Sequence, residues 1–317
     1  MISRASGKSG NVLIVGTGAL ATLFAARLAR AGLGVTVLGR WLYGVRALRD
    51  AGARLVDESG NEEKYAVTVA DDPADCRGCT YALVLVKSWQ TERAARDLAD
   101  CLVDDGLALT LQNGLGNREI LASRLGTDRV LLGSTTTGAT LLGPGLVKPG
   151  GEGKISVEAH TGLNPLRAAL ELAGFKVEIV QDASSLVWHK LVINSAINPL
   201  TALLRVSNGQ LLERPSARAL MRALAKETAA VASAESVALA PRDAVRTVEN
   251  VALRTASNHS SMFQDVQRGA RTEIDAICGA VTRIGKQHHI ATPMNQACWQ
   301  LIQALTESPR ERSEHIT

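Results

Sequence analysis

Short apolar runs alternate with amphipathic stretches along the first half of the chain. The runs are rich in Val, Leu, Ile and Ala, whereas the stretches between them repeat apolar residues at the spacing of a helix. The runs predict strands at residues 12–15, 35–38, 66–70, 82–86, 108–111 and 130–133. Strands that alternate with helices in this way are typical of a doubly wound sheet with helices on both faces.

Beyond this alternation, residues 135–158 are rich in Gly, Thr and Pro and carry alternating apolar residues, as in 145–148 and 154–157. This pattern predicts additional β-structure that closes the edge of the sheet. A helix up to residue 173 and a last strand at 176–180 complete the first half.

From about residue 182 onward, the apolar spacing is that of helices alone. Helices are predicted at 187–204, 215–240, 243–257 and 272–288. The predicted fold is therefore an α/β domain at residues 11–181, with the boundary near Gln181, followed by an all-helical domain at 182–317. Residues 1–10 are polar and small and are expected to form a disordered leader, and the charged tail from Ser308 is expected to be loose.

The first predicted strand leads directly into the sequence G-x-G-x-x-A, and a helical pattern follows. Gly16 permits a tight turn, Gly18 lets backbone N–H groups approach a pyrophosphate, and Ala21 lets helix and strand pack closely. This order of elements predicts a Rossmann-type dinucleotide site, with a nucleotide-free α/β domain as the alternative. The turn residues predicted to contact the dinucleotide are Gly16, Thr17, Gly18, Ala19 and Leu20.

The second strand ends in Gly39-Arg40-Trp41, where a site that prefers NAD would place an Asp or Glu for the ribose 2′-hydroxyl. The planar fork of Arg40 can instead pair with a 2′-phosphate, and Trp41 or the Arg40 plane could lie along the adenine. Arg40 therefore favours NADP(H), with an ordinary surface arginine as the alternative.

A lysine and two carboxamides follow one another at four-residue spacing in the apolar segment 188–200. In a helix, Lys190, Asn194 and Asn198 share one face. Burying such a row costs free energy unless a polar group meets it, and a small oxygen-rich substrate would satisfy all three side chains. A partly exposed polar stripe would explain the same pattern.

Two further polar groups follow predicted strands. Asn113 in Gln-Asn-Gly and Lys87 in Lys-Ser-Trp-Gln stand where open α/β sheets bind ligands, at the carboxyl ends of strands. Lys87 could meet a phosphate or a substrate carboxylate. For Asn113 the alternative is a turn formed by Asn-Gly.

A capping-box pattern, Thr272-x-x-Asp275, predicts that the last long helix starts at Thr272 with Glu273 in its first turn. A helix N-terminus favours an ionised carboxylate, so Glu273 is a candidate for chemistry as well as for simple capping. On a continuous helix, Ser261 and Glu273 would be about 18 Å apart, too far to grip one small molecule. If both do so, the chain must turn between them, and Gly269 is the expected place.

The 317-residue chain is 46% hydrophobic and 21% charged, which suits two domains with full cores and no membrane-spanning segment. Only 3% of residues are aromatic, so no nucleic-acid partner is expected, and a basic cofactor cleft accounts for the net charge of +4. Five cysteines are consistent with reduced cytosolic thiols. Cys76-x-x-Cys79 lacks a second pair that would complete a zinc site, so no metal is predicted.

Several of these motifs together carry a family resemblance. They are G-T-G-A-L-A at Gly16, Arg40, K-S-W-Q at Lys87, Q-N-G at Asn113, W-H-K-L-V-I-N-S-A-I-N-P-L-T-A-L around Lys190, S-N-G at Asn208, S-S-M-F-Q-D at Ser260 and T-E-I-D at Thr272. From Asn11 to about Leu305 the chain resembles the ketopantoate reductase family. The resemblance implies an NADPH-dependent, cytoplasmic enzyme that reduces 2-dehydropantoate (ketopantoate), a small 2-oxo acid, to pantoate for pantothenate and coenzyme A biosynthesis. It implies a helical domain similar to that of 6-phosphogluconate dehydrogenase, and it is compatible with a homodimer.

By the same resemblance, Lys190 matches the catalytic lysine and Glu273 the essential carboxylate. The positions that match substrate-binding residues are Asn113, Asn194, Asn198, Asn208 and Ser261. The positions that match cofactor-binding residues are Gly16, Thr17, Gly18, Ala19, Leu20, Arg40, Lys87, Gln90 and Asn113. Ala21 replaces a frequent third glycine, and Lys148 stands where many relatives carry His, which leaves the choice of oxo acid open.

Reduction of a ketone builds negative charge on the carbonyl oxygen, which the Lys190 ammonium can stabilise before it yields its proton. Apolar surroundings would lower the pKa of Lys190 and make it a better general acid. Glu273 could orient the lysine or hold a substrate hydroxyl, and Ser261 with Asn198 could hold the carboxylate. Two alternatives stay open: another NADP-dependent 2- or 3-hydroxyacid dehydrogenase, and a non-catalytic NADPH-binding regulator, which would not need the acid.

Overall fold

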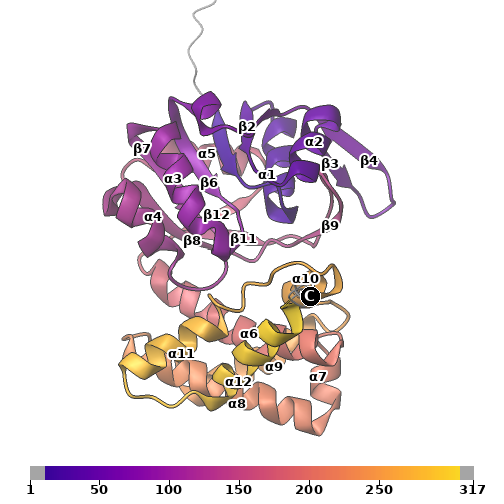
Figure 1. Cartoon of the computed structure of the whole chain (residues 1–317), viewed down its shortest axis with the longest axis vertical. Coiled ribbons are helices and arrows are strands. Elements are labelled where there is room, and N and C mark those ends of the chain that lie inside the picture. The colour runs from indigo at the N-terminus through magenta and orange to yellow at the C-terminus, as the bar shows by residue number, and fades with distance from the viewer. Residues whose placement is uncertain (1–10, 308–317) are drawn as a thin grey trace, which may run out of the picture. The chain divides into compact units, whose positions relative to one another are not determined.

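The computed structural model describes residues 11–307, which form two compact units (Figure 1). The first unit extends to Val187 and the second begins at Trp188. This division falls inside helix α6 (Ala183–Leu204), shortly after the boundary expected near Gln181. The expected leader at 1–10 and the tail from Ser308 lie outside the described residues.

An eight-stranded sheet forms the centre of the first unit. Its strands are β1 (Val12–Val15), β2 (Val35–Leu38), β5 (Thr68–Ala70), β6 (Cys79–Val84), β7 (Leu102–Thr110), β8 (Val130–Thr135), β11 (Lys154–Glu158) and β12 (Lys176–Val180). They lie in the order β12-β11-β8-β7-β6-β1-β2-β5, and every neighbouring pair is parallel except β8 with β11. The chain adds β2 and β5 on one side of β1 and then returns to add β6, β7 and β8 on the other. This reversal confirms the predicted doubly wound, Rossmann-type sheet.

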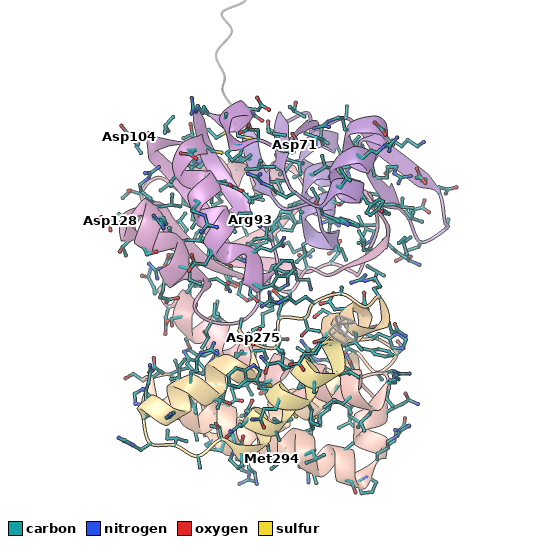
Figure 2. The ribbon with its side chains drawn as sticks, viewed as in Figure 1. Asp71, Arg93, Asp104, Asp128, Asp275 and Met294 are labelled. Carbon is teal, nitrogen blue, oxygen red and sulfur yellow. The ribbon has the colours of Figure 1, made fainter. Side chains whose placement is uncertain are left out.

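Helices cover both faces of this sheet (Figure 1). They are α1 (Ala19–Arg30), α2 (Leu42–Ala51), α3 (Thr91–Cys101), α4 (Asn117–Leu125) and α5 (Asn164–Leu172). Val12 and Ile14 of β1 pack in one core with α1 and α5, whereas Leu13 and Val15 pack in the other with α3 and α4. Because side chains alternate along a strand, burial on both sides explains why the strands read as unbroken apolar runs. Charged side chains lie on the outside of the unit, among them Asp71, Arg93, Asp104 and Asp128 (Figure 2).

A second, four-stranded sheet packs against α1. Its strands are β3 (Ala53–Val56), β4 (Glu62–Tyr65), β9 (Ala139–Gly143) and β10 (Leu146–Pro149), in the order β4-β3-β10-β9. The prediction that segment 145–148 closes the edge of the large sheet is therefore wrong, while segment 154–157 does extend that sheet as β11. The reason is burial: Leu55 of β3 and Val147 of β10 join the core over α1.

The second unit is helical throughout its described part, as predicted (Figure 1). After α6 come α7 (Gln210–Glu213), α8 (Pro215–Ala234), α9 (Pro241–Arg254), α10 (Ser261–Gln267), α11 (Cys278–Gln287) and α12 (Pro293–Thr306). Glu227 of α8 caps α12: its carboxylate accepts hydrogen bonds from the backbone N–H groups of Met294 and Asn295, each at 2.9 Å. None of the helices within residues 11–307 is long and apolar enough to cross a membrane.

The last long helix does not start at Thr272, so that prediction is wrong. Residues 273–277 form turns, and α11 begins at Cys278. The capping box fails because the Asp275 carboxylate accepts hydrogen bonds from Trp299 and Gln303 of α12 instead. The hydroxyl of Thr272 accepts a bond from the backbone of Ile274, in a local turn.

Candidate active site

The glycine-rich turn joins β1 to α1 at the point where the strand order of the large sheet reverses. Gly16 has φ +129°, and a Cβ there would lie 3.1 Å from the backbone carbonyl of Leu85, so the turn requires glycine. A Cβ on Gly18 would meet no atom within 4 Å. The fold therefore leaves space at Gly18, beside a helix N-terminus that no described side chain caps. Such an end suits an anion.

Gly39 packs closely against this turn, since a Cβ on Gly39 would lie 2.3 Å from the methyl group of Thr17. Arg40, the next residue, therefore stands beside the turn. Its guanidinium contacts the carboxylate of Asp97 on α3, with 3.3 Å between Nη2 and Oδ1. The Arg40 side chain is 44% exposed and that of Asp97 only 12%. One side of the guanidinium is thus held by a nearly buried acid while the rest faces outward. Sequence reasoning missed Asp97 because nothing along the chain relates it to β2.

The loops after β6 and β7 are tied together by a polar network. Gln112 donates from Nε2 to the carbonyl of Val86 at 3.1 Å and to the hydroxyl of Thr91 at 2.8 Å. Thr91 lies 2.8 Å from Asn117, which donates in turn to the carbonyl of Asn113 at 3.0 Å. These supporting residues were not predicted, although Gln112 adjoins a predicted site residue.

This network brings the segments of Lys87 and Asn113 to the same edge of the sheet, at the carboxyl ends of parallel strands. The side chain of Gln90 accepts a hydrogen bond from the backbone N–H of Lys87 at 3.3 Å and so shapes the turn after β6. Gly114 has φ +82°, so Asn113 also belongs to a turn.

The polar row at four-residue spacing lies on a single helix, α6. Lys190 and Asn194 are partly buried and Asn198 is buried. Pro199 lies within α6 and has no N–H, so it cannot bond the carbonyl of Ser195 one turn earlier. Cys278, the first residue of α11, instead places its Sγ 3.8 Å from that carbonyl oxygen.

Lys190 and Glu273 are coupled electrostatically. Burial lowers the pKa of Lys190 to about 8, and the carboxylate of Glu273 acts in the opposite direction. Glu273 is 5% exposed. A lysine with a pKa about one unit above neutrality is mostly protonated at pH 7 and can still release its proton readily, which is what a general acid requires.

Ser261 is the exposed first residue of α10. Its neighbour Ser260 caps the helix and lies 2.7 Å from the hydroxyl of Thr201 on α6, so α10 is attached one turn beyond Asn198. Gly269 has φ +63° just after α10, which confirms the predicted turn of the chain between Ser261 and Glu273.

Asn208 connects the loop after α6 with the end of α9. It donates from Nδ2 to the Thr255 hydroxyl at 2.9 Å, and its backbone N–H donates to the carbonyl of Asn258 at 3.0 Å. This arrangement gives Asn208 a clear supporting role within the helical unit.

The five cysteines, including Cys76 and Cys79, are buried. Residues 11–307 contain no cluster of His, Cys, Asp or Glu that could hold a metal ion.

Comparison with known proteins covers both halves of the chain. The family model described as ketopantoate reductase PanE/ApbA matches residues 12–162, and that of the ketopantoate reductase PanE/ApbA C terminal matches residues 182–306. A 2-dehydropantoate 2-reductase of Halobacterium salinarum is 36% identical over 297 residues, 92% of this chain and 97% of its own. The crystal structure of a PanE/ApbA family ketopantoate reductase from Ralstonia eutropha JMP134 is similar with a TM-score of 0.86 at 32% identity, covering 93% of this chain and 98% of that one. The chain therefore belongs to the ketopantoate reductase family.

D-mandelate dehydrogenase, solved with NADH and anilino(oxo)acetate, superposes with the same TM-score of 0.86 but at 24% identity, covering 93% of this chain and 98% of that one. This likeness shows a shared fold and nothing further about substrate.

We predict that Lys190 titrates near pH 8 and that Glu273→Gln moves its midpoint to lower pH, because loss of the carboxylate removes the charge that favours the ammonium. NMR titration of ¹³C-methylated lysines, with Lys190→Ala to assign the signal, measures this. Glu213→Gln, an exposed change on α7, is the control. An ordinary lysine midpoint, or one that Glu273→Gln leaves in place, would show that the two groups are not coupled.

Proposed function

We propose that this protein is a 2-dehydropantoate 2-reductase that uses NADPH to reduce the 2-oxo group of ketopantoate to the alcohol of pantoate, in the cytoplasm. The observation that carries the proposal is a lysine, Lys190, whose pKa is lowered by burial and raised by the charge of Glu273, in a chain that matches the family over both its α/β and its helical part. The family's curated relatives with this activity support the choice of substrate.

The glycine-rich turn provides the cofactor site in this proposal. The space at Gly18 and the uncapped start of α1 fit a pyrophosphate. Arg40 pairs with the 2′-phosphate, and Lys87, Gln90 and Asn113 complete the cofactor contacts. When bound, NADPH supplies the hydride.

Lys190 provides the proton. As the carbonyl carbon gains a hydride, negative charge develops on the oxygen, and the Lys190 ammonium stabilises that charge and transfers a proton from Nζ to the oxygen. Its lowered pKa makes the transfer easier, while Glu273 keeps the amine protonated in the resting enzyme.

The carboxamides and hydroxyl provide substrate recognition. Asn194 and Asn198 share the helix of Lys190, and Ser261 begins a helix attached to α6. Asn208, also in the helical unit, and Asn113, in the α/β unit, are the other proposed substrate-binding residues, and each carboxamide offers a donor and an acceptor. A substrate without the hydroxyl would leave some of them unpaired, which costs binding free energy.

Two other functions are less well supported. Another hydroxyacid dehydrogenase would share the fold, but several relatives at 30% to 36% identity are named 2-dehydropantoate 2-reductases. A regulator that only binds NADPH would not need a partly buried lysine with a lowered pKa, whose desolvation costs free energy.

The proposed substrate is tested by initial rates of NADPH oxidation with a panel of oxo acids. We expect ketopantoate to give the highest kcat/KM and pyruvate a far lower one, because pyruvate lacks the branched, hydroxylated side chain. A higher kcat/KM for pyruvate or for a 3-oxo acid would refute the proposed substrate.

The proposed cofactor preference is tested by Arg40→Ala. Loss of a charge-assisted contact of roughly 1.5 to 3 kcal/mol should raise the Kd of NADPH about tenfold or more and leave that of NADH nearly unchanged. The matched control is Arg46→Ala, because Arg46 is also an exposed arginine and lies nearby in sequence, on α2. Equal weakening of both cofactors would show that Arg40 does not recognise the 2′-phosphate.

A further inference from the structure

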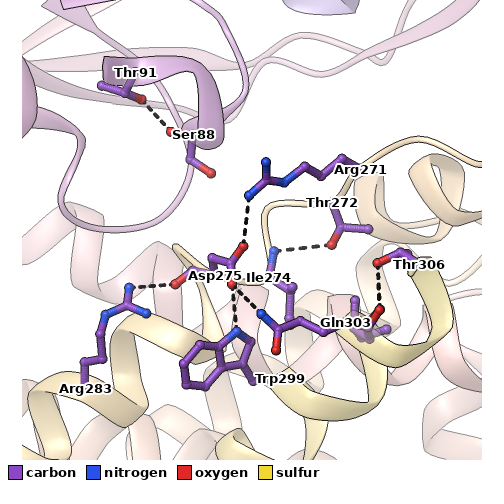
Figure 3. A network of polar contacts seen from close by, with 11 residues as sticks. Ser88, Thr91, Arg271, Thr272, Ile274, Asp275, Arg283, Trp299, Gln303 and Thr306 are labelled. Carbon is purple, nitrogen blue, oxygen red and sulfur yellow. Dashed lines mark hydrogen bonds and ion pairs between the residues drawn. The ribbon is translucent and has the colours of Figure 1, made fainter. Parts of the chain in front are cut away.

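Asp275 lies two residues after Glu273 and joins its turn to α12 (Figure 3). One carboxylate oxygen, Oδ1, accepts hydrogen bonds from Trp299 Nε1 at 2.8 Å and from Gln303 Nε2 at 2.9 Å. Trp299 and Gln303 are four residues apart on α12, so they present their donors from successive turns of one helix. Hydrogen bonds to an ionised carboxylate are stronger than those between neutral groups.

The backbone and surroundings of Asp275 reinforce this attachment. Its carbonyl accepts a bond from Arg283 Nη2 at 2.9 Å, and the Arg283 guanidinium lies 5.5 Å from the centre of the Trp299 ring (Figure 3). A Cβ on Gly279 would lie 2.9 Å from the indole, so the start of α11 packs closely on Trp299.

Backbone hydrogen bonds link this turn to Glu273. The backbone N–H groups of Ala276 and Ile277 both donate to the carbonyl of Glu273 at 3.1 Å, which links the backbone on either side of Asp275. Glu227 in turn holds the N-terminus of α12. A chain of contacts therefore runs from α8 through α12 and Asp275 to Glu273.

We propose that Asp275 is a positioning residue of the reductase: by fastening the turn of Glu273 to α12, it sets the distance between the Glu273 carboxylate and the Lys190 amine. This inference rests on the proposed function for its catalytic consequence, whereas the positioning itself is a property of the helical unit alone.

If Asp275 only stabilised the fold, replacing it would unfold the segment around Glu273, and the structure argues against this. The turn has its own backbone hydrogen bonds, and Thr272, Ile274 and Ile277 are at most 2% exposed, so the segment stays folded without the carboxylate. The Asp275 side chain is itself 38% exposed, so replacing it opens no buried cavity. Weakening these hydrogen bonds, or removing one of them, should loosen the turn rather than unfold the unit.

The test compares Asp275→Asn and Gln303→Ala with Gln300→Ala. The last removes an exposed glutamine from the same helix and is the matched control. Asn keeps the shape of Asp and an oxygen that can accept both bonds, but it lacks the charge that strengthens them, whereas Gln303→Ala removes one of the two donors. For both test variants, we expect kcat to fall by about 10-fold to 100-fold with little change in the KM for NADPH, since a displacement of about 1 Å has effects of this size.

The pH profile separates positioning from general damage. The charge of Glu273 raises the pKa of the Lys190 amine. A loosened turn weakens this effect, so the alkaline limb of kcat/KM should move to lower pH in Asp275→Asn and Gln303→Ala. In a Glu273→Gln background, Asp275→Asn should cause no further shift, because the charge it positions is gone.

Two measurements need no turnover: hydrogen exchange of the peptide containing residues 273–277, and NMR titration of Lys190. Faster exchange together with a lower Lys190 midpoint in both variants supports the inference even if the wild-type protein proves inactive on ketopantoate, an outcome that would count against the proposed function alone. Unchanged exchange and midpoint, or the same changes in Gln300→Ala, would overturn it. If Asp275→Asn lowers the Tm strongly, the milder Gln303→Ala variant decides.

Discussion

The electrostatic balance at Lys190 is the constraint on which the catalytic account depends. Burial disfavours the ammonium, and the Glu273 carboxylate partly offsets that cost, leaving a pKa of about 8. Neither effect is useful unless the distance between the two groups is maintained, because electrostatic interaction in a poorly hydrated site changes steeply with separation.

The structure maintains this distance through contacts that are far apart in sequence. The hydroxyls of Thr201 and Ser260 link α6 to α10. The thiol of Cys278 contacts the carbonyl of Ser195, which lacks a helical hydrogen bond because Pro199 has no N–H. Asp275 then attaches the turn of Glu273 to α12. The helical unit thus supports a lysine from one helix and a glutamate from a separate turn. In the α/β unit the backbone has the larger role, since Gly16 allows the tight turn and Gly18 leaves room at the start of α1.

The sequence correctly predicted the elements whose signal, a period or a spacing of residues, lies within one segment. The strand, turn and helix around Gly16 are confirmed, as is the single helix that carries Lys190, Asn194 and Asn198, because period and spacing are properties of one segment. Strands β3 and β4 were missed: β4 reads Glu-Glu-Lys-Tyr and is largely exposed, so it carries no apolar signal. The capping box at Thr272 was misread because its Asp is used by α12, and the Arg40–Asp97 pair was not foreseen because it joins elements distant along the chain. Contacts between side chains that are distant in sequence cannot be predicted from the periodicity of a single segment.

The central claim, that Lys190 donates the proton, is tested most directly by kcat of Lys190→Ala with NADPH and ketopantoate, measured together with the Kd of NADPH and the Tm. The account predicts that kcat falls by about 10² to 10⁴, the usual range for general acid catalysis, while the Kd and Tm stay near their wild-type values. A variant that keeps most of its turnover, or one that is slow only because it has unfolded, would contradict the claim.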